Sequence, residues 1–286
     1  MSVVGKIAEI HRYPVKSMRG EALTSCDIGP LGLWGDRGWA VRDEKSGEIR
    51  GAKNFPKLMT CEARYSEEPG PTHIPVATIT LPGGQSLPAD SDDANQHLSE
   101  FLGREVTLHP LRPKEDSDHY RRTQALDETT LRELLGRRPE DPMPDLSTMP
   151  EEVMAELMEF TSPRGTYFDA FPVQLLTTSW LDHLRKEAPE SEFEVGRFRP
   201  NFLVDEAEPG LAEEKWCGKI LRIGSVEIKC EVPTVRCSMT TRATGSLPDD
   251  RNVLKTILRV SGQNAGAYAT VIKAGRISVG DLVELS

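Results

Sequence analysis

Short apolar segments bounded by turn residues recur along this chain, and they do not alternate regularly with helical patterns. The stretch from 226 to 232 shows this most clearly, because apolar residues alternate there with Glu227, Lys229 and Glu231. Alternation with a period of two is typical of a strand that buries one face. A doubly wound sheet needs strands and helices in regular succession, so this order argues against one. We predict a mainly β fold, with a barrel-like core and peripheral helices.

Helical patterns and one polar connection divide the chain. Asp92 or Asp93 is predicted to cap a helix that ends at Gly103. Further helices are predicted over 127–136, 150–160, 177–184 and 250–258. Residues 112–125 contain almost no aliphatic side chain, as expected for a connection between domains. We therefore predict two domains, residues 1–112 and residues 126–286, of which the first consists mainly of strands.

Composition limits what the protein binds. A chain of 286 residues with 37% hydrophobic and 28% charged residues is typical of a globular protein with substantial cores. The formal net charge of -10 argues against nucleic acid and anionic membranes as main partners. No apolar run approaches the roughly 18 residues that cross a bilayer, and the first residues show no signal or transit pattern. We expect a cytoplasmic protein that binds neither nucleic acid nor a membrane.

The five cysteines are scattered and include no Cys-x-x-Cys pair, which argues against a disulfide framework or a four-cysteine metal site. A bound metal would then use one protein sulfur and take its other ligands from elsewhere. Cys237 is the candidate, because Arg236 precedes it and positive charge favours a thiolate. The alternative is an ordinary buried cysteine. Cys230 fits that alternative better, because it shares the apolar face of the 226–232 strand.

Three basic clusters lie near predicted strand ends. They are residues 13–20 with Lys16 and Ser17, residues 34–39 with Arg37, and residues 197–201 with Arg199 and Asn201. An arginine offers a rigid fork of donors that matches phosphate, and Pro200 restrains the backbone between Arg199 and Asn201. The alternative for each cluster is a solvated surface loop. Three such clusters in an acidic protein together indicate an anion site.

Two further residues have both a structural and a functional interpretation. Thr177 opens a predicted helix, where it caps the first turn or helps to present free backbone N–H groups to an anion. Asp169 lies in a loop, where it forms a turn or one polar wall of a pocket. The histidines show no metal-ligand spacing, and the sequence contains no P-loop, dinucleotide fingerprint or nucleophile elbow.

These motifs, in this order, resemble the MOSC family, the domain named after the C-terminal part of molybdenum cofactor sulfurases. The similarity rests on the segments Ile7–Met18 (including Tyr13–Ser17), Gly35–Arg37, Asp169–Val173, Leu175–Thr177, Phe198–Asn201, Trp216, Ile223–Gly224 and Arg236–Thr241. It covers nearly the whole chain, as an N-terminal β-barrel domain followed by the MOSC domain. Each motif alone is unspecific, whereas the ordered set is strong.

The resemblance implies a molybdenum–pyranopterin cofactor. In the amidoxime reducing component group, a cysteine thiolate ligates molybdenum, and Cys237 matches that cysteine. The positions that match residues holding the pterin and its phosphate are Lys16, Ser17, Arg37, Arg199, Asn201 and Arg236, and the helix N-terminus at Thr177 is added to them. The implied reaction is reduction of small N-hydroxylated substrates, such as hydroxylamines and amidoximes. Its electrons would come from a separate ferredoxin- or cytochrome-type donor system.

The chain also departs from its relatives. They often have a cysteine three residues before the ligand, where this chain has Thr234, so a pair of redox cysteines is not available there. No fused iron–sulfur domain is recognised, which is why we expect a separate electron donor. Two other functions remain open: a sulfur carrier with a persulfide on Cys237, and a non-catalytic carrier of the cofactor.

Overall fold

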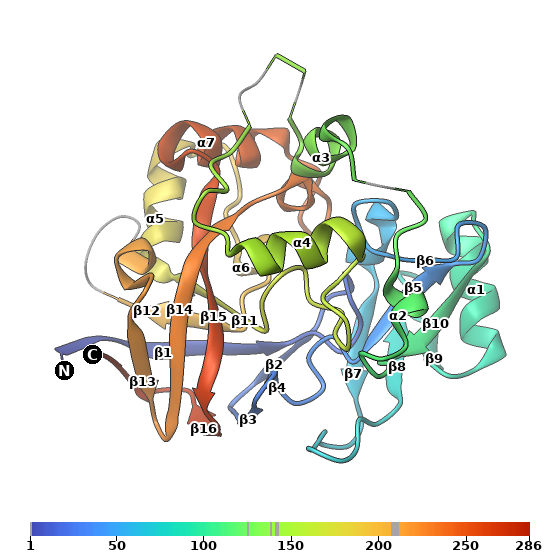
Figure 1. Ribbon diagram of the computed structural model, residues 1–286, viewed down its shortest axis with the longest axis horizontal. Helices are drawn as coiled ribbons and strands as arrows, with labels where there is room; N and C mark the ends of the chain where they lie inside the picture. The colour runs from blue at the N-terminus through green and yellow to red at the C-terminus, as the bar shows by residue number, and fades with distance from the viewer. Residues whose placement is uncertain (1, 125, 138, 141–142, 207–211) are drawn as a thin grey trace.

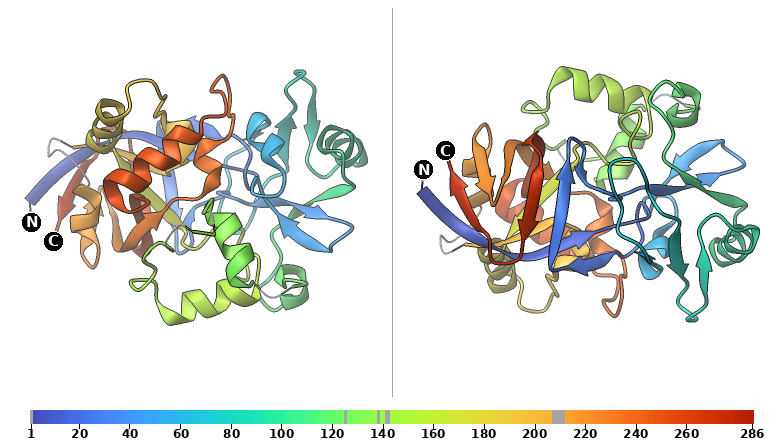
Figure 2. Two further views of the ribbon diagram at one scale, coloured as in Figure 1. Left: turned by 90° about the horizontal axis from the view of Figure 1, so that it is seen from above. Right: turned by 90° about the horizontal axis from the view of Figure 1, so that it is seen from below.

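The computed structural model describes residues 2–124, 126–137, 139–140, 143–206 and 212–286. A barrel of strands occupies one side of the molecule, with one small antiparallel sheet beside it, formed by β16 (Gly275–Ser278), β3 (Ser25–Gly29) and β4 (Gly32–Leu33). Two further small sheets occupy the other side, with helices packed around them (Figure 1). The predicted mainly β fold with peripheral helices is confirmed. Both termini lie at one end of the barrel (Figure 2), where Ser2 pairs with Leu285.

Seven described strands form the closed barrel, and β1 closes the ring by pairing with β12. In spatial order they are β12 (Phe202–Asp205), β11 (Val173–Thr177), β15 (Asn264–Lys273), β14 (Val226–Val235), β13 (Ile220–Ile223), β17 (Leu282–Leu285) and β1 (Ser2–Arg12), and β2 (Glu21–Leu23) pairs with β1. The predicted alternation in β14 buries Val226, Ile228 and Cys230 in the barrel core. Cys230 therefore lies where the sequence pattern places it.

The other described strands form three small antiparallel sheets. β5 (Trp39–Asp43) lies between β6 (Glu48–Arg50) and β10 (Val106–Pro110), β8 (Ala77–Thr80) lies between β7 (Glu62–Tyr65) and β9 (Ser86–Pro88), and β3 (Ser25–Gly29) lies between β4 (Gly32–Leu33) and β16 (Gly275–Ser278). Strands β1 and β3 thus pair with strands from the C-terminal part of the chain. The division into residues 1–112 and 126–286 stays a prediction. Met1 and Ala125, close to its limits, lie outside the described residues.

The helices surround these sheets. They are α1 (Asp92–Leu102), α2 (Ser117–Tyr120), α3 (Glu128–Leu135), α4 (Glu151–Glu159), α5 (Thr178–Glu187), α6 (Val195–Phe198) and α7 (Arg251–Ser261), with 3₁₀ turns η1 (Pro56–Thr60), η2 (Ala212–Trp216) and η3 (Ser238–Thr241). Gly103 ends α1 in the left-handed conformation, as predicted. The N-cap of α1 is Ser91, whose hydroxyl accepts from the Ala94 amide, rather than Asp92 or Asp93. Within the described ranges, no helix combines the length and apolar character needed to cross a membrane.

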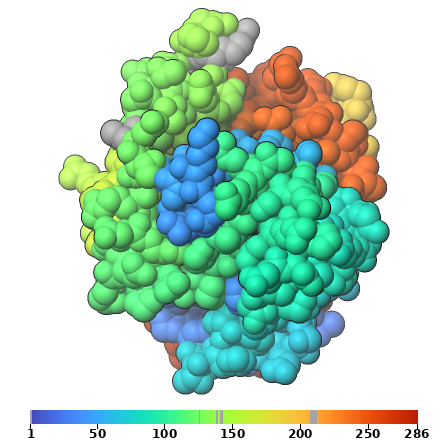
Figure 3. All heavy atoms as spheres, turned by 90° about the vertical axis from the view of Figure 1, so that its right-hand side faces the viewer, coloured from blue at the N-terminus to red at the C-terminus, as the bar shows by residue number. Residues whose placement is uncertain are grey.

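A buried tyrosine anchors the connection that was predicted to be polar. Tyr120 packs with Ile49, Phe160 and Tyr167, and its hydroxyl donates to the Arg112 carbonyl (2.6 Å). One aromatic residue in a polar stretch gives no periodic signal, so the sequence pattern did not indicate this contact. On the face shown in Figure 3, the part of the chain that contains Tyr120 (green) lies against the N-terminal part (blue to teal), and the Tyr120 cluster joins the two.

Candidate functional site

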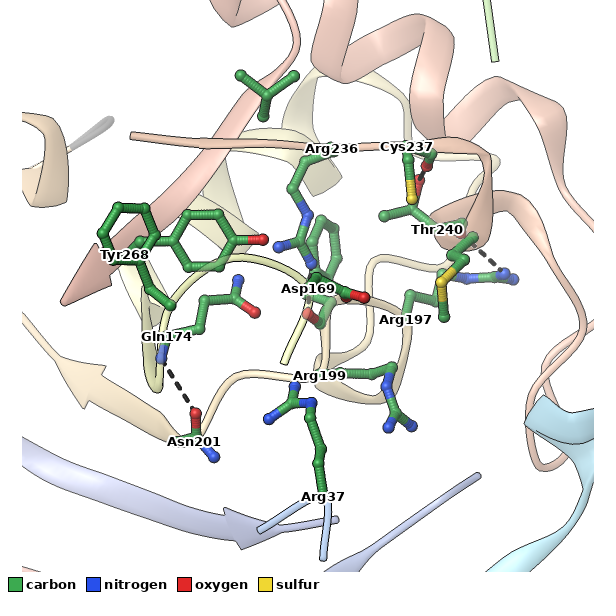
Figure 4. Close-up of a pocket in the computed structure, with 14 residues that line it drawn as sticks. Arg37, Asp169, Gln174, Arg197, Arg199, Asn201, Arg236, Cys237, Thr240 and Tyr268 are labelled. Atoms are coloured by element: carbon green, nitrogen blue, oxygen red, sulfur yellow. Dashed lines mark hydrogen bonds between the residues drawn. The ribbon is translucent and has the colours of Figure 1, made fainter. Parts of the chain in front are cut away.

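A pocket that contains several charged side chains lies on the outer face of the barrel, beside the end of β14 (Figure 4). Val173, Leu175 and Ala269 point into the barrel core, so Gln174 and Tyr268, which alternate with them, point to the opposite face. The residues that line this space, the Cys237 pocket, include Arg37, Asp169, Gln174, Arg197, Arg199, Asn201, Arg236, Cys237 and Tyr268. Residues predicted separately from three distant sequence segments thus meet in one pocket.

Several site residues have a left-handed backbone. Among the described residues, the non-glycine positions with positive φ are Ser17 (72°), Arg37 (50°), Arg199 (55°) and Gln263 (90°). The fourth is absent from the described lining of the pocket, but its side-chain amide donates to the carbonyl of Arg236, which belongs to that lining (2.6 Å). Such a conformation costs about 1–3 kcal/mol for a residue with a side chain, and it persists where the surroundings enforce it. The strain in this backbone is therefore concentrated at the predicted site.

Arg199 lies at the end of the short helix α6, just before β12. Its guanidinium stacks over the ring of Tyr13, 4.2 Å from the centroid, and Nη1 donates to the Met18 carbonyl (2.5 Å). Nη2 is buried and has no hydrogen-bond partner among the described residues. Burial lowers the pKa of Arg199 to about 10. A buried cation with an unmade hydrogen bond favours an anion that can accept it.

Asp36 orients the base of the pocket, although it was not predicted as a site residue. Its carboxylate accepts from the Tyr13 amide (2.8 Å) and from Nδ2 of Asn201 (3.0 Å), and it pairs with Arg37. The other end of the Asn201 amide accepts from the backbone N–H of Gln174 (3.0 Å). Asn201 is thus a positioning residue, because both ends of its amide are bound within the protein. The sequence signal that could have indicated Asp36 is its position directly before Arg37.

Arg236 and Arg197 have different environments, although both line the pocket. Arg236 stacks over the ring of Phe198 (5.3 Å) and donates to the Phe198 carbonyl. When the side-chain amide of Gln174 is turned over, its oxygen accepts from Nη1 of Arg236 (2.5 Å). Arg197 donates to the carbonyls of Glu192 (2.8 Å) and Pro248 (2.9 Å). The guanidinium of Arg236 therefore borders the pocket, whereas that of Arg197 links two loops through their backbone carbonyls.

Lys16 and Ser17 line an adjoining cleft, which shares Asp169 with the Cys237 pocket. Lys16 Nζ donates to Asp169 (2.9 Å) and to the Tyr167 carbonyl (2.7 Å). Burial opposes ionisation of Asp169, but the charges of Lys16, Lys53 and Arg37 outweigh it and hold its pKa well below the usual range. The carboxylate therefore stays ionised at the junction of the two spaces.

Cys237 follows β14 and precedes η3, and its sulfur points into the pocket (Figure 4). It is partly exposed, whereas Cys230 is buried, which separates the two interpretations that the sequence left open. Thr234 is buried in β14, and it is absent from the described lining of the pocket. Nowhere in the described ranges do three His, Cys, Asp or Glu side chains form a metal-binding group. A metal at Cys237 would thus need further ligands from a cofactor or solvent.

Thr177 is not brought to the pocket. Its hydroxyl accepts from the Trp180 amide (3.3 Å) as the N-cap of α5, and donates to the buried carboxyl of Glu213 (2.8 Å). Thr177 is fully buried, and it is absent from the described linings of the Cys237 pocket and of the adjoining cleft. The capping interpretation is confirmed, and the predicted cofactor contact through Thr177 finds no support in this arrangement.

The burial of Glu213, the residue that Thr177 contacts, predicts a pH dependence of stability. Burial, with a smaller contribution from Glu206, raises the pKa of Glu213 from 4.5 to about 7. The folded state therefore retains a proton that the unfolded chain releases, and stability is lost as pH rises toward 7. The free energy of unfolding, relative to Glu213→Gln, should fall by about 2–3 kcal/mol between pH 5 and 8. Urea unfolding at several pH values measures this free energy. The control Glu105→Gln, at an exposed position, should leave the pH dependence of stability unchanged. A difference between the unmodified protein and Glu213→Gln that does not vary with pH would contradict the raised pKa of Glu213.

The network around Asp36 predicts a large loss of stability in Asp36→Ala. The change leaves Arg37 buried without its carboxylate and removes acceptors from Tyr13 and Asn201. Breaking a buried pair from one side costs about 3–5 kcal/mol. The control is Asp27→Ala, because Asp27 pairs with Arg276 at the surface (3.0 Å) and should cost less than about 1 kcal/mol. Equal costs in urea unfolding would show that the Asp36 network does not support the site.

Comparison with known proteins matches both halves of the chain. Residues 4–109 match the model of the MOSC N-terminal beta barrel domain, and residues 162–284 match that of the MOSC domain. The chain is 27% identical over 305 residues to mitochondrial amidoxime reducing component 2 of Rattus norvegicus, with 98% of this chain and 83% of the relative covered. It is 26% identical over 317 residues to mitochondrial amidoxime-reducing component 1 of Mus musculus, at 99% and 82% coverage. Among solved structures, the YuaD protein of Bacillus subtilis aligns with a TM-score of 0.46 and 11% identity, over 99% of this chain and 95% of that one.

Proposed function

The chain belongs to the MOSC family, and on this premise we propose that it binds a molybdenum–pyranopterin cofactor and reduces N-hydroxylated substrates. One observation carries the proposal: the sulfur of Cys237 and the guanidinium groups of Arg37, Arg199 and Arg236 border the same pocket. The similarity to amidoxime reducing components supports the choice of reaction.

The residues present suit such a group in charge and in donor chemistry. Four buried cations, Lys16, Arg37, Arg199 and Arg236, face only two nearby carboxylates, Asp36 and Asp169, among the described residues. An anionic phosphate would balance this excess, and the unpartnered Nη2 of Arg199 would donate to it. A thiolate is a soft ligand, which suits a metal that its cofactor already holds through sulfur.

Each residue has a role that follows from its contacts. Cys237 would hold the metal, while Arg37, Arg199 and Arg236, with Lys16 and Ser17 in the adjoining cleft, would hold the pterin and its phosphate. Asp36 and Asn201 position these groups. When bound, the cofactor supplies electron transfer to the substrate, and the protein supplies binding and orientation.

Two side chains of the pocket, those of Tyr268 and Asp169, can form hydrogen bonds with the reacting groups of the substrate. Reduction of a hydroxylamine to an amine and water consumes two electrons and two protons. Burial raises the pKa of Tyr268, so its hydroxyl keeps its proton at neutral pH and can donate a hydrogen bond to the departing oxygen. Asp169 stays ionised and can only accept, so it orients a donor such as the substrate N–H group.

We propose that a second protein, of a ferredoxin- or cytochrome-type reductase system, supplies the electrons. The test uses protein purified from a host that makes the cofactor, with chemically reduced viologen as the donor and benzamidoxime as the substrate. Conversion to benzamidine and water at a rate proportional to molybdenum content is expected. Metal-loaded protein that reduces no amidoxime or hydroxylamine would instead identify a carrier of the cofactor.

A further inference from the structure

The cleft beside the Cys237 pocket is built from several separate segments. Its walls include the turn from Gly51 to Asn54, the residue Arg122, the helix α3, and Met239 and Arg242 of the segment after β14. It shares Asp169 and Met239 with the Cys237 pocket, so the two spaces adjoin. A substrate bound beside Cys237 therefore lies next to this cleft.

Positive charge dominates the cleft. The described lining contains the cations Lys16, Arg50, Lys53, Arg122 and Arg242 and the carboxylates Glu133 and Asp169. Lys16 is neutralised by Asp169 (2.9 Å), and Arg50 pairs with Glu48 outside the lining (2.8 Å). The Nε of Arg122 donates to the Leu157 carbonyl (3.0 Å), which satisfies a donor but not its charge. The pairs inside the cleft thus leave an excess of cations.

Lys53 and Arg242 have neither an ion pair nor a side-chain hydrogen bond with any described residue. Lys53 is close enough to Asp169 and Lys16 to influence the pKa of each. Both cations are therefore available to a ligand. Lys53 lies at the junction with the Cys237 pocket, and Arg242 lies on the wall formed by the segment after Met239. The other cations in the lining of the cleft, Lys16, Arg50 and Arg122, each form an ion pair or a hydrogen bond with a protein group.

The backbone that carries these two cations is fixed by site residues. Ser17 Oγ accepts from the Ala52 amide (2.8 Å), and a Cβ on Gly51 would lie 2.7 Å from the same oxygen, so the turn packs tightly on Ser17. The carbonyl of Arg242 accepts from Nη1 of Arg197 (3.1 Å). Fixed backbones at both walls present the two charged groups from defined positions, as a binding site requires.

We propose that this cleft is an anion subsite, and that the N-hydroxylated substrate carries a carboxylate or phosphate group that binds Lys53 and Arg242. The inference rests on the proposed function for the reacting end of the substrate. Two unpaired cations beside an adjoining pocket favour an anion tethered to the group that reacts there. The phosphate of the cofactor, which Lys16 and Ser17 of the same cleft would help to hold, or a nucleotide extension of the cofactor, would bring the same chemistry. The experiment must therefore separate the substrate from the cofactor as the source of the anion.

The first arm compares benzamidoxime with para-carboxybenzamidoxime, which differ by one carboxylate. The ratio of kcat/KM for the charged substrate to that for the neutral one should fall roughly tenfold in Lys53→Gln and in Arg242→Gln, and further in the double variant. The control is Lys273→Gln, an exposed lysine at the end of β15, which should leave the ratio unchanged. A ratio near one in the unmodified protein, or an equal fall in the control, overturns the proposal.

The second arm does not depend on turnover. Calorimetric titration of para-carboxybenzamidoxime, without an electron donor, should show binding that weakens roughly tenfold in each cleft variant. Mass spectrometry of the released cofactor identifies the source of the anion. Cleft variants that lose the cofactor, or a nucleotide attached to it, but bind the substrate equally well overturn the substrate assignment. Protein that binds the charged substrate in the cleft yet contains no molybdenum would refute the proposed function and leave the anion subsite supported.

Discussion

Cys237→Ala should abolish reduction of amidoximes and leave the fold almost unchanged. The sulfur points into the pocket and the residue is partly exposed, so its removal creates no closed cavity in a core. Loss of a residue that only supports a metal ligand typically costs roughly 10–100-fold in activity or affinity, and loss of the ligand itself should cost more. We expect turnover to fall by at least about a hundredfold, with a change of less than about 1 kcal/mol in the free energy of unfolding.

Cys230→Ala is the matched control. Cys230 lies in the barrel core, and burial raises the pKa of its thiol, so it is an inert part of the packing. Its removal should cost about 1–2 kcal/mol of stability and leave turnover per folded molecule intact. The two cysteines should therefore show opposite patterns in urea unfolding and in steady-state assays. Full activity in Cys237→Ala would contradict the assigned role of this thiol.

Arg199→Gln should separate cofactor binding from stability. The guanidinium is buried, lacks one hydrogen-bond partner and has its pKa lowered to about 10, which corresponds to a cost on the order of 3 kcal/mol for keeping it charged. Part of that cost is offset by its bond to the Met18 carbonyl, which the variant weakens. The cofactor-free variant should therefore be about 1–2 kcal/mol more stable than the unmodified protein.

The same variant should retain little molybdenum, because the anion loses a donor that no described protein group uses. Metal content per chain and urea unfolding of the metal-free form measure the two effects together. Arg276→Gln serves as the control, since Arg276 pairs with Asp27 at the surface and should alter neither quantity appreciably. A destabilised metal-free Arg199→Gln protein that still binds molybdenum would show that Arg199 serves the fold rather than the cofactor.

The strands of the barrel could be predicted because their patterns are local. Alternation in β14 placed Cys230 in the core, and the glycine at 103 marked the end of α1. The closure of the barrel was not readable in this way, because β1 pairs with β12 and β17 across most of the chain length. A serine directly before two aspartates also gave competing capping signals, and the geometry selected Ser91.

Only part of the site could be predicted, because residue types are visible in the sequence but their three-dimensional contacts are not. Arg37, Arg199 and Arg236 could be recognised as cations near strand ends. The left-handed backbones of Arg37 and Arg199, and the aromatic rings that stack against all three guanidinium groups, are tertiary features. Asp36 and Tyr268 were missed because a single acidic or aromatic residue in a strand or turn carries no spacing signal. Thr177 was assigned to the site because a helix N-cap looks the same in sequence whether it faces an anion or a buried carboxyl such as that of Glu213.

The central claim is that the Cys237 pocket holds a molybdenum–pyranopterin cofactor. Elemental analysis together with pterin fluorescence, on folded protein purified from a host that makes the cofactor, tests it most directly. We predict about one molybdenum and one pterin per chain in the unmodified protein, with both reduced in Arg199→Gln. Folded protein that contains neither molybdenum nor pterin under these conditions would contradict the claim.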